Sequence, residues 1–491
     1  MITGLLFRDQ NAQWNSKPDG DREVRHSDLK LGSILQAMSG GDPVIFQSAR
    51  QLLDQPLRSW EEIRYRQEIL KECLQMPERI AELYEICLQA EKKRKNTWCR
   101  LTSPHLTTVY SSAADLLKIY MEALVEIMKT MKSCLFHSSG LDALSRRLQQ
   151  ELTDAYLEEV RSLESGIGDR EGILISAGFG PYLQGVDYIK RQPESGFSRL
   201  RWLLQPSYTL ADRDMNGAKD LEVRKDRAIN EVANAMAQAA GSLQAFVDQL
   251  GKELAFYLGC IHLYQRLTEL QLPMCFPQES EDRFYQGLYD GGLALQTGTR
   301  VTGSTLEAHQ KEMWLITGAN QGGKTTFLRS VGICQLMAQC GMFVCCEACR
   351  IPLRRQIFTH FCREEDRHLN SGKLDEELGR MSAIVEKIRP GAMLLSNESF
   401  SSTNDRDGSE LFQGITRALL EKKIEVFAVT HLIGYALSMA DREDVISLRP
   451  ERKENGVRTF RILEGKPSPE AYAEDIYRRI FSGENPEESE A

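Results

Sequence analysis

The 491-residue sequence contains no long hydrophobic run and no surplus of positive charge. No stretch approaches the roughly 20 apolar residues that a membrane-spanning helix requires, and residues 1–11 lack the basic start and long apolar stretch of a secretory signal. Lys and Arg number 61 and Asp and Glu number 70, so the net charge is −9 and nucleic acid would need a local basic patch. The sequence therefore predicts a cytoplasmic protein with no membrane partner.

Proline and aromatic residues are also sparse, with 16 prolines and 8% aromatic residues. Because 42% of the residues are hydrophobic, the composition excludes disordered and collagen-like chains and favours a folded protein with sizeable cores. At about 100–200 residues per domain, the length predicts about three domains or one extended architecture with a catalytic module at one end.

The 12 cysteines show no disulfide framework, and without an export signal we expect them to be reduced thiols. Cys346 and Cys349 form one Cys-x-x-Cys step, which could be half of a zinc site if Cys340 or Cys362 supplied the rest. A second closely spaced pair is missing, and residues 341–344 are typical of a buried strand in which Cys is a small apolar residue. We expect no zinc.

The pattern of apolar residues divides the chain into three parts. Residues 1–104 are predicted to form the α-helical N-terminal part of a core domain, and residues 105–275 long lever helices. Ser139 and Gly140 are predicted to form a turn between two of these helices. Glycines and prolines mark a partly β, clamp-like insert at about 166–227, and the helix that resumes at residue 228 would be roughly 60 Å long. Residues 276–491 alternate short strands with helices and predict an α/β domain.

A phosphate-binding loop is the most specific motif in the sequence. Residues 313–317 read as a buried strand, residues 318–325 fit the pattern G-x-x-x-x-G-K-[ST], and a helical run follows. Lys324 would reach the β and γ phosphates, and the Thr325 hydroxyl would bind Mg²⁺, so the predicted cofactors are ATP and Mg²⁺. The alternative is a Gly-rich turn with an exposed lysine. The predicted nucleotide-binding residues are Gly318, Ala319, Asn320, Gln321, Gly322, Gly323, Lys324, Thr325 and Thr326.

Two further strands end in polar residues that a nucleotide hydrolase could use. Asn397 and Glu398 close the strand at residues 392–396, where an Asp is expected in place of Asn397. Glu398 is the predicted general base, and Asn397 could hold a metal-bound water through its side-chain carbonyl, so the predicted metal site is Thr325, Asn397 and Glu398. Thr430 and His431 end the strand at residues 426–429, and His431 could sense the γ phosphate or hold the attacking water. The alternatives are a solvated turn glutamate and a structural histidine.

These motifs resemble those of the MutS DNA mismatch-repair ATPases, a branch of the ABC-type ATPases. The sequence GANQGGKTTFLRSVG at 318–332 is similar to the phosphate loop of that family, NESFSSTNDRDG at 397–408 to its Asp-Glu segment, and VTHL at 429–432 to its Thr-His switch. The resemblance covers most of residues 290–465. It implies an α-helical core and lever region with a small, partly β insert, followed by an α/β P-loop (ABC-type) ATPase domain. The N-terminal mismatch-recognition domain of the family, with its Phe-x-Glu wedge, is expected to be absent.

Family likeness further implies that two ATPase domains pair head to tail in a homodimer, each site completed by the other subunit. The residues that could reach across this dimer are Ser371, Gly372, Lys373, Ser402 and Thr403. The alternative for residues 371–373 is a solvated loop that caps the next helix. Nucleotide contacts made only in the closed dimer would bias an open–closed equilibrium, which suits a clamp on DNA.

DNA contacts, if present, are expected in the insert. The best candidates are Lys190, Arg191, Arg199 and Arg201, although acidic residues in the same stretch also suit a solvated mixed-charge face. The predicted function is therefore a slow, partner-stimulated ATPase of DNA repair or recombination that binds mismatched, branched or otherwise non-standard DNA as an ATP-gated clamp. Two alternatives are a nucleotide-gated dimerisation scaffold with weak hydrolysis and an ATPase that acts on a ribosome or protein partner.

Overall fold

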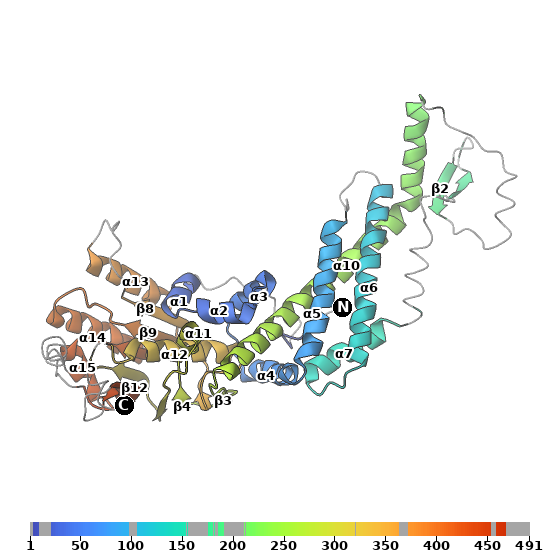
Figure 1. Cartoon of the computed structure of the whole chain (residues 1–491). Helices are drawn as coiled ribbons and strands as arrows, with labels where there is room; N and C mark the ends of the chain where they lie inside the picture. Colours follow the sequence, from blue (N-terminus) through green and yellow to red (C-terminus); the bar gives the residue numbers. More distant parts are fainter. Residues whose placement is uncertain are drawn as a thin grey trace. The chain divides into compact units, whose positions relative to one another are not determined.

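The structure is a computed structural model, and Figure 1 labels its helices and strands. It describes residues 3–8, 21–97, 106–153, 155, 175–179, 181, 185–190, 211, 213–319, 321–362, 372–452 and 458–467. The chain divides into a helical unit, Met1–Leu6 with Met76–Leu254, and a sheet unit, Phe7–Gln75 with Ala255–Ala491. Within the described part of the chain, no helix is both long enough and apolar enough to cross a bilayer.

The helical unit is built from long amphipathic helices. Its helices are α5 (Pro77–Asn96), α6 (Leu106–Lys132), α7 (Ser139–Glu151) and the part of α10 (Met215–Glu269) that ends at Leu254. α5 packs along α6, and apolar residues spaced three or four apart, such as Ile80, Leu83 and Tyr84 on α5, are buried. The predicted helical character of this region is confirmed.

Two predicted boundaries in the helical unit are wrong. Ser139 and Gly140 are not a turn but the first residues of α7, because the helical hydrogen bonds already begin at the Ser138 carbonyl, which accepts from Asp142 N at 3.1 Å. α10 begins at Met215 and not at residue 228. The side chains of its first turns are almost all exposed, so this part of the helix has no apolar stripe that the sequence could reveal.

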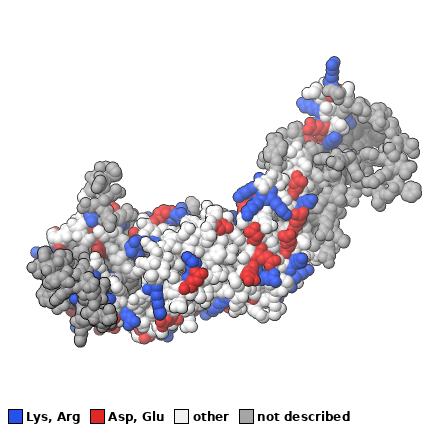
Figure 2. Space-filling model, viewed as in Figure 1, with Lys and Arg blue, Asp and Glu red and all other residues white. Residues whose placement is uncertain are grey.

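The predicted β element of the insert is confirmed as an antiparallel pair of strands, β1 (Ile175–Phe179) and β2 (Gly185–Lys190). Lys190, one of the DNA candidates, pairs with Ile175 at the end of this ladder. Arg191, Arg199 and Arg201 lie outside the described residues. On the visible face of the helical unit, basic and acidic side chains are interspersed (Figure 2), and the ion pairs Lys93–Glu122 and Lys95–Glu91 belong to this unit.

The sheet unit contains a six-stranded sheet in the order β12-β11-β6-β10-β9-β8. β8, β9, β10, β6 and β11 are parallel, and β12 is antiparallel at the edge. Parallel strands bring their carboxyl ends to one edge of a sheet, where α/β proteins bind ligands. The bounds are β6 (Met313–Ile316), β8 (Ile357–Phe361), β9 (Met393–Asn397), β10 (Glu425–Val429), β11 (Val445–Arg452) and β12 (Arg458–Glu464).

Helices cover both faces of this sheet, so the predicted α/β domain is confirmed. Leu315, Val426 and Ala428 share one buried cluster with residues of α13 (Lys373–Lys387), α14 (Asp405–Glu421) and α15 (Ile433–Ala440). α12 (Lys324–Gln339) packs on β9 and β10 so closely that a Cβ atom at Gly332 would lie 2.6 Å from the Leu395 side chain. Alternate residues of the strands therefore face different helices, as a pleated sheet requires.

A smaller sheet and the N-terminal helices complete the sheet unit. The smaller sheet has four strands in the order β3-β7-β4-β5. Its elements are β3 (Gln278–Glu279), β4 (Arg283–Leu288), β5 (Ser304–Ala308) and β7 (Ala348–Ile351), with α11 (Gly291–Thr297) between β4 and β5. The N-terminal helices are α1 (Arg22–Asp28), α2 (Gly32–Ser39), α3 (Pro43–Leu53) and α4 (Trp60–Gln75).

The N-terminal helices belong with the sheet unit and not with the helices that follow them, so the unit limits differ from the predicted boundaries at 104 and 275. Leu57 N donates to the Gln339 carbonyl at 2.7 Å, and Arg66 Nη1 donates to the Cys340 carbonyl at 3.2 Å. Arg66 is fully buried. Such contacts join residues about 280 positions apart, which local periodicity cannot reveal.

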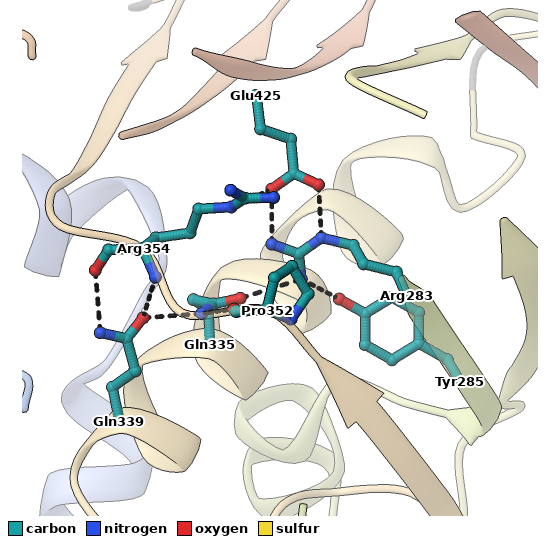
Figure 3. Close-up of polar contacts among 7 residues, drawn as sticks. All are labelled: Arg283, Tyr285, Gln335, Gln339, Pro352, Arg354 and Glu425. Carbon is teal, nitrogen blue, oxygen red and sulfur yellow. Dashed lines mark hydrogen bonds and ion pairs between the residues drawn. The ribbon is translucent and has the colours of Figure 1, made fainter. Parts of the chain in front are cut away.

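A buried polar network links the two sheets of this unit to α12 (Figure 3). Both oxygens of Glu425, the first residue of β10, accept from Arg283 at 2.5 Å, and Arg354 Nε donates to Glu425 Oε2 at 2.8 Å. Arg283 also donates to Gln335 on α12 at 2.9 Å. Gln335 in turn donates to Gln339 Oε1 at 2.6 Å. Burying charges is costly unless they are paired and hydrogen-bonded, and here the carboxylate is fully paired.

We expect Glu425→Gln to lower the free energy of unfolding of the sheet unit by about 3–5 kcal/mol, because it leaves two guanidinium groups beside an uncharged partner. The measurement is chemical denaturation at neutral pH. Glu410→Gln is the control, since Glu410 pairs with Arg406 on the exposed face of α14 and should contribute less than about 1 kcal/mol. Equal losses for the two variants would contradict this account.

The contribution of Glu425 should also depend on pH. Burial alone would raise the pKa of Glu425, but Arg283 and Arg354 outweigh it and hold the pKa below its ordinary value of 4.5. The stabilisation is therefore complete above pH 4.5 and is lost as the pH falls through the lower pKa of the folded state. The stability difference between the wild-type protein and Glu425→Gln should shrink on acidification, and denaturation at a series of pH values measures it.

Candidate active site

The loop after β6 has the backbone geometry of an anion cradle. Gly318 and Gly323 have φ angles of +123° and +87°, which favour glycine, and α12 begins at Lys324 directly after the loop. A Cβ atom at Gly322 would lie 2.8 Å from the Pro450 side chain and 3.1 Å from the Ala319 carbonyl oxygen. The glycines therefore let the chain turn tightly into the N-terminus of α12, where free N–H groups attract anions. Asn320 lies outside the described residues.

Lys324 is a buried cation at this helix terminus. Only 4% of the residue is exposed, which rules out the exposed lysine of a simple Gly-rich turn. Its ammonium donates to the Gly318 carbonyl and, at 3.2 Å, to the Ala319 carbonyl. Burial lowers the pKa of Lys324, and the nearby Glu398 carboxylate partly opposes this. A bound anion would favour the charged form of this amine.

The end of β9 meets the start of α12 through one hydrogen bond. Thr325 Oγ1 donates to Asn397 Oδ1 at 2.9 Å, so the structure brings two residues of the predicted metal site together across 72 positions of sequence. Hydroxyl and amide oxygens are hard ligands that suit Mg²⁺ or the waters around it. These residues fit the metal that the phosphate loop implies. No group of three or more His, Cys, Asp or Glu side chains placed to hold a metal occurs among the residues that the structure describes.

Glu398 follows in an unusual backbone conformation. Its φ angle is +54°, which is uncommon for a residue with a side chain, and its N–H donates to the Val429 carbonyl at 2.8 Å. The residue lines the same cavity as Lys324 and Thr325. The turn thus places Glu398 at the cavity that the phosphate loop also lines, and its role as general base stays a prediction.

The cavity has a volume of about 570 Å³, within the range of small-molecule sites. The phosphate loop forms part of its lining. The lining also includes residues that no sequence motif indicated: Leu288, Tyr289, Leu293, Val301 and Phe460. They come from β4, the segment between β4 and α11, α11, the segment before β5 and the edge strand β12, so only the folded chain brings them together.

His431 does not line this cavity and is exposed. Its neighbour Thr430 is fully buried, donates from its N–H to the Ile316 carbonyl at 3.1 Å and accepts from Leu432 N at 3.0 Å. The strand end therefore fixes Thr430, while the role of His431 as a switch stays a prediction.

The residues predicted to act across a dimer lie in two places. Lys373 begins α13, Gly372 precedes it as the N-cap residue, and Ser371 lies outside the described residues. Ser402 donates to Glu377 Oε2 at 3.2 Å, and Thr403 is partly buried just before α14. None of these described residues lines the cavity, and their contact with another subunit stays a prediction.

The thiols of Cys346 and Cys349 approach Cys275 and Cys334, not Cys340, which the sequence offered as a further zinc ligand. Cys346 lies 3.5 Å from Cys275, and Cys349 lies 3.7 Å from Cys334, measured between sulfur atoms. Cys340 instead donates to the Leu52 carbonyl at 3.2 Å. Residues 341–344 form only an isolated bridge, from Val344 to Cys275, and not the predicted strand, because the chain turns at Gly341 with a φ angle of +75°. All cysteines in the described ranges are free thiols.

Comparison with protein families agrees with this geometry. Residues 58–270 match the MutS2 N-terminal domain, and residues 314–473 match MutS domain V. The chain belongs to the MutS family. The second match starts in β6 and includes the phosphate loop, Asn397, Glu398 and Thr430.

Curated relatives from this family cover the chain only in part. Endonuclease MutS2 of Pelotomaculum thermopropionicum is 28% identical over 265 residues, which are 52% of this chain and 32% of the relative. Endonuclease MutS2 of Thermus thermophilus is 30% identical over 175 residues, 34% of this chain and 22% of the relative. DNA mismatch repair protein MutS of Thermotoga neapolitana is 30% identical over 159 residues, which are 32% of this chain and 20% of the relative. The chain thus spans a fifth to a third of the length of these relatives.

We expect Gly322→Ala to weaken binding of a fluorescent ATP analogue by about tenfold or more, a change of about 1.4 kcal/mol. The added methyl group would meet Pro450 and the Ala319 carbonyl and force the loop to shift. Gly414→Ala is the matched control, because a Cβ atom on this α14 residue would meet nothing within 4 Å. Unchanged affinity in the Gly322 variant would show that the loop does not bind the phosphates.

Proposed function

We propose that this chain binds ATP with Mg²⁺ in the described cavity and hydrolyses the γ phosphate. The observation that carries the proposal is the convergence of Lys324, Thr325 and Glu398 on one cavity beside a left-handed glycine loop. This set supplies a cation, a metal-ligating hydroxyl and a carboxylate, which are the parts that phosphoryl transfer to water needs.

The cavity suits a nucleotide at both ends. The N–H groups of the loop and the Lys324 ammonium would hold the phosphates. The ammonium already lies at the loop, where it donates to the Gly318 and Ala319 carbonyls. Tyr289, Val301 and Phe460 offer apolar and aromatic surface for a base. Tyr289 is held in place by the hydrogen bond from its hydroxyl to the Pro273 carbonyl at 3.0 Å.

Thr325 and Asn397 would hold the metal ion, directly or through water. When bound, Mg²⁺ neutralises charge on the phosphate oxygens. Asn397 supplies an oxygen without a negative charge, so the site holds one charge fewer than it would with Asp at this position. Glu398 would accept the proton of the attacking water, and Lys324 would stabilise the charge that develops on the phosphate.

We further propose that the protein acts on DNA as an ATP-gated dimeric clamp. Two of the relatives described above are named as an endonuclease and a DNA mismatch repair protein, and family membership supports the same class of partner for this chain. The DNA contact would use Lys190 with Arg191, Arg199 and Arg201 in the insert, and Ser402 with residues 371–373 would complete the partner's site. Specificity would then depend on DNA shape or a partner protein.

Steady-state ATP turnover tests both parts of the proposal. We expect Glu398→Gln to reduce turnover by about 10²- to 10⁴-fold, the usual contribution of a general base, while ATP binding persists. Glu410→Gln, on the exposed face of α14, is the control and should leave turnover unchanged. The assay is run without DNA and with linear, mismatched, branched and single-stranded DNA at two salt concentrations.

Stimulation by one DNA form that weakens with salt would support the clamp, since phosphate contacts release counterions. Turnover that depends on Glu398 but has the same rate with every DNA form and without DNA would favour a ribosome or protein partner. Turnover of the wild-type protein no higher than that of Glu398→Gln would contradict hydrolysis and favour the nucleotide-gated scaffold.

We expect Asn397→Asp to lower the Mg²⁺ concentration that gives half-maximal ATP binding, by about tenfold, because a carboxylate binds this cation more strongly than an amide. The measurement is a Mg²⁺ titration with the fluorescent analogue. Asn230→Asp, on an exposed position of α10, adds the same charge elsewhere and should not change the titration. Equal Mg²⁺ dependence of all three proteins would show that Asn397 is remote from the metal.

A further inference from the structure

The turn that presents Glu398 is locally strained and held by its surroundings. Glu398 and Phe400 both have positive φ angles, +54° and +60°, although neither is glycine. Such conformations persist only where neighbouring groups determine them, and they gather at functional sites. Ser399 lies between them and is fully buried.

A buried histidine anchors this turn. His360, in β8, has no exposed surface, and its Nδ1 lies 2.6 Å from Ser399 Oγ. Its Nε2 lies 3.1 Å from the Glu377 carbonyl oxygen, which can only accept, so the neutral ring carries its proton on Nε2. Nδ1 therefore accepts from the Ser399 hydroxyl, which also lies 2.6 Å from Ser396 Oγ and 3.2 Å from the His360 carbonyl. The His360 ring also stacks on Phe400, with centroids 5.8 Å apart.

The same histidine joins the turn to α13. Glu377 is a residue of α13 that is 1% exposed, and it accepts from His360 through its carbonyl and from Ser402 through its side chain at 3.2 Å. His360, Ser399, Ser402 and Glu377 thus close a ring of contacts around the residues that follow Glu398. α13 begins at Lys373, in the segment predicted to reach the other subunit.

We infer that His360 is a positioning residue: through Ser399 it holds the turn that aims the Glu398 carboxylate, and through Glu377 it ties this turn to α13. The inference rests on the proposed role of Glu398 in hydrolysis. A displacement of α13 would reach the catalytic carboxylate through this ring, without any contact between α13 and the nucleotide.

Two substitutions of His360 distinguish its hydrogen bond with Ser399 from its hydrogen bond with Glu377. In His360→Asn the amide oxygen replaces Nδ1 and still accepts from Ser399, whereas in His360→Gln the amide nitrogen replaces Nε2 and still donates to Glu377. We expect His360→Gln to lower kcat by tenfold or more with unchanged affinity for the ATP analogue, and His360→Asn to keep kcat within threefold of the wild type. Ser399→Ala should match His360→Gln, and the double variant should be no slower than either, because both changes remove the same bond.

Hydrogen exchange of the peptide that spans residues 398–403 gives a readout that does not require turnover. It should accelerate in His360→Gln and Ser399→Ala but stay close to the wild type in His360→Asn. Equal effects of the Asn and Gln variants on exchange, or wild-type turnover in His360→Gln, would overturn the inference. If wild-type turnover does not exceed that of Glu398→Gln, hydrolysis itself fails, and exchange still decides whether His360 holds the turn.

Discussion

The sheet unit depends on one buried carboxylate. Glu425 begins β10, the strand between β6 and β9, and it is paired with Arg283 from β4 and Arg354 from the segment after β7. Leaving a buried charge unpaired costs about 3–5 kcal/mol, so a shift of either sheet that broke this network would be strongly unfavourable. Gln335 and Gln339 extend the network into α12, the helix that begins directly after the phosphate loop.

The same sheet geometry brings the candidate catalytic groups together. Val429 pairs with Ile316 on one side and with Asn397 on the other, so the loops that follow β6, β9 and β10 leave the sheet side by side. The hydrogen bond from Thr325 to Asn397 spans two of these loops. The end of β10 contributes backbone contacts, since the Val429 carbonyl accepts from Glu398 N and Thr430 N donates to the Ile316 carbonyl. The site is therefore held by main-chain pairing at every strand end.

The groups that would act on the nucleotide lie at the edge of this sheet in locally unfavourable arrangements. Lys324 is buried against carbonyl groups, with its pKa lowered by desolvation, and Glu398 stands on a turn with unfavourable backbone angles. Both arrangements are held by neighbours: the Gly318 and Ala319 carbonyls for the lysine, and His360 with Ser399 for the glutamate. Rigid strands that support strained loops are a common design of catalytic sites.

The sequence by itself determined the strand–loop–helix of the phosphate site and the strand-end positions of Asn397 and Glu398, because each follows from a short local pattern. It also indicated the β pair of the insert and the helical character of the first part. Only the tertiary structure decided that residues 7–75 join the sheet unit, that Tyr289, Val301 and Phe460 face the phosphate loop, and that His360 supports the Glu398 turn. These contacts join residues far apart in sequence. The first residue of α10 was predicted wrongly for another reason, because the exposed start of this helix has no apolar periodicity. Local patterns carry information only over a few turns of chain, whereas packing depends on which distant surfaces bury one another.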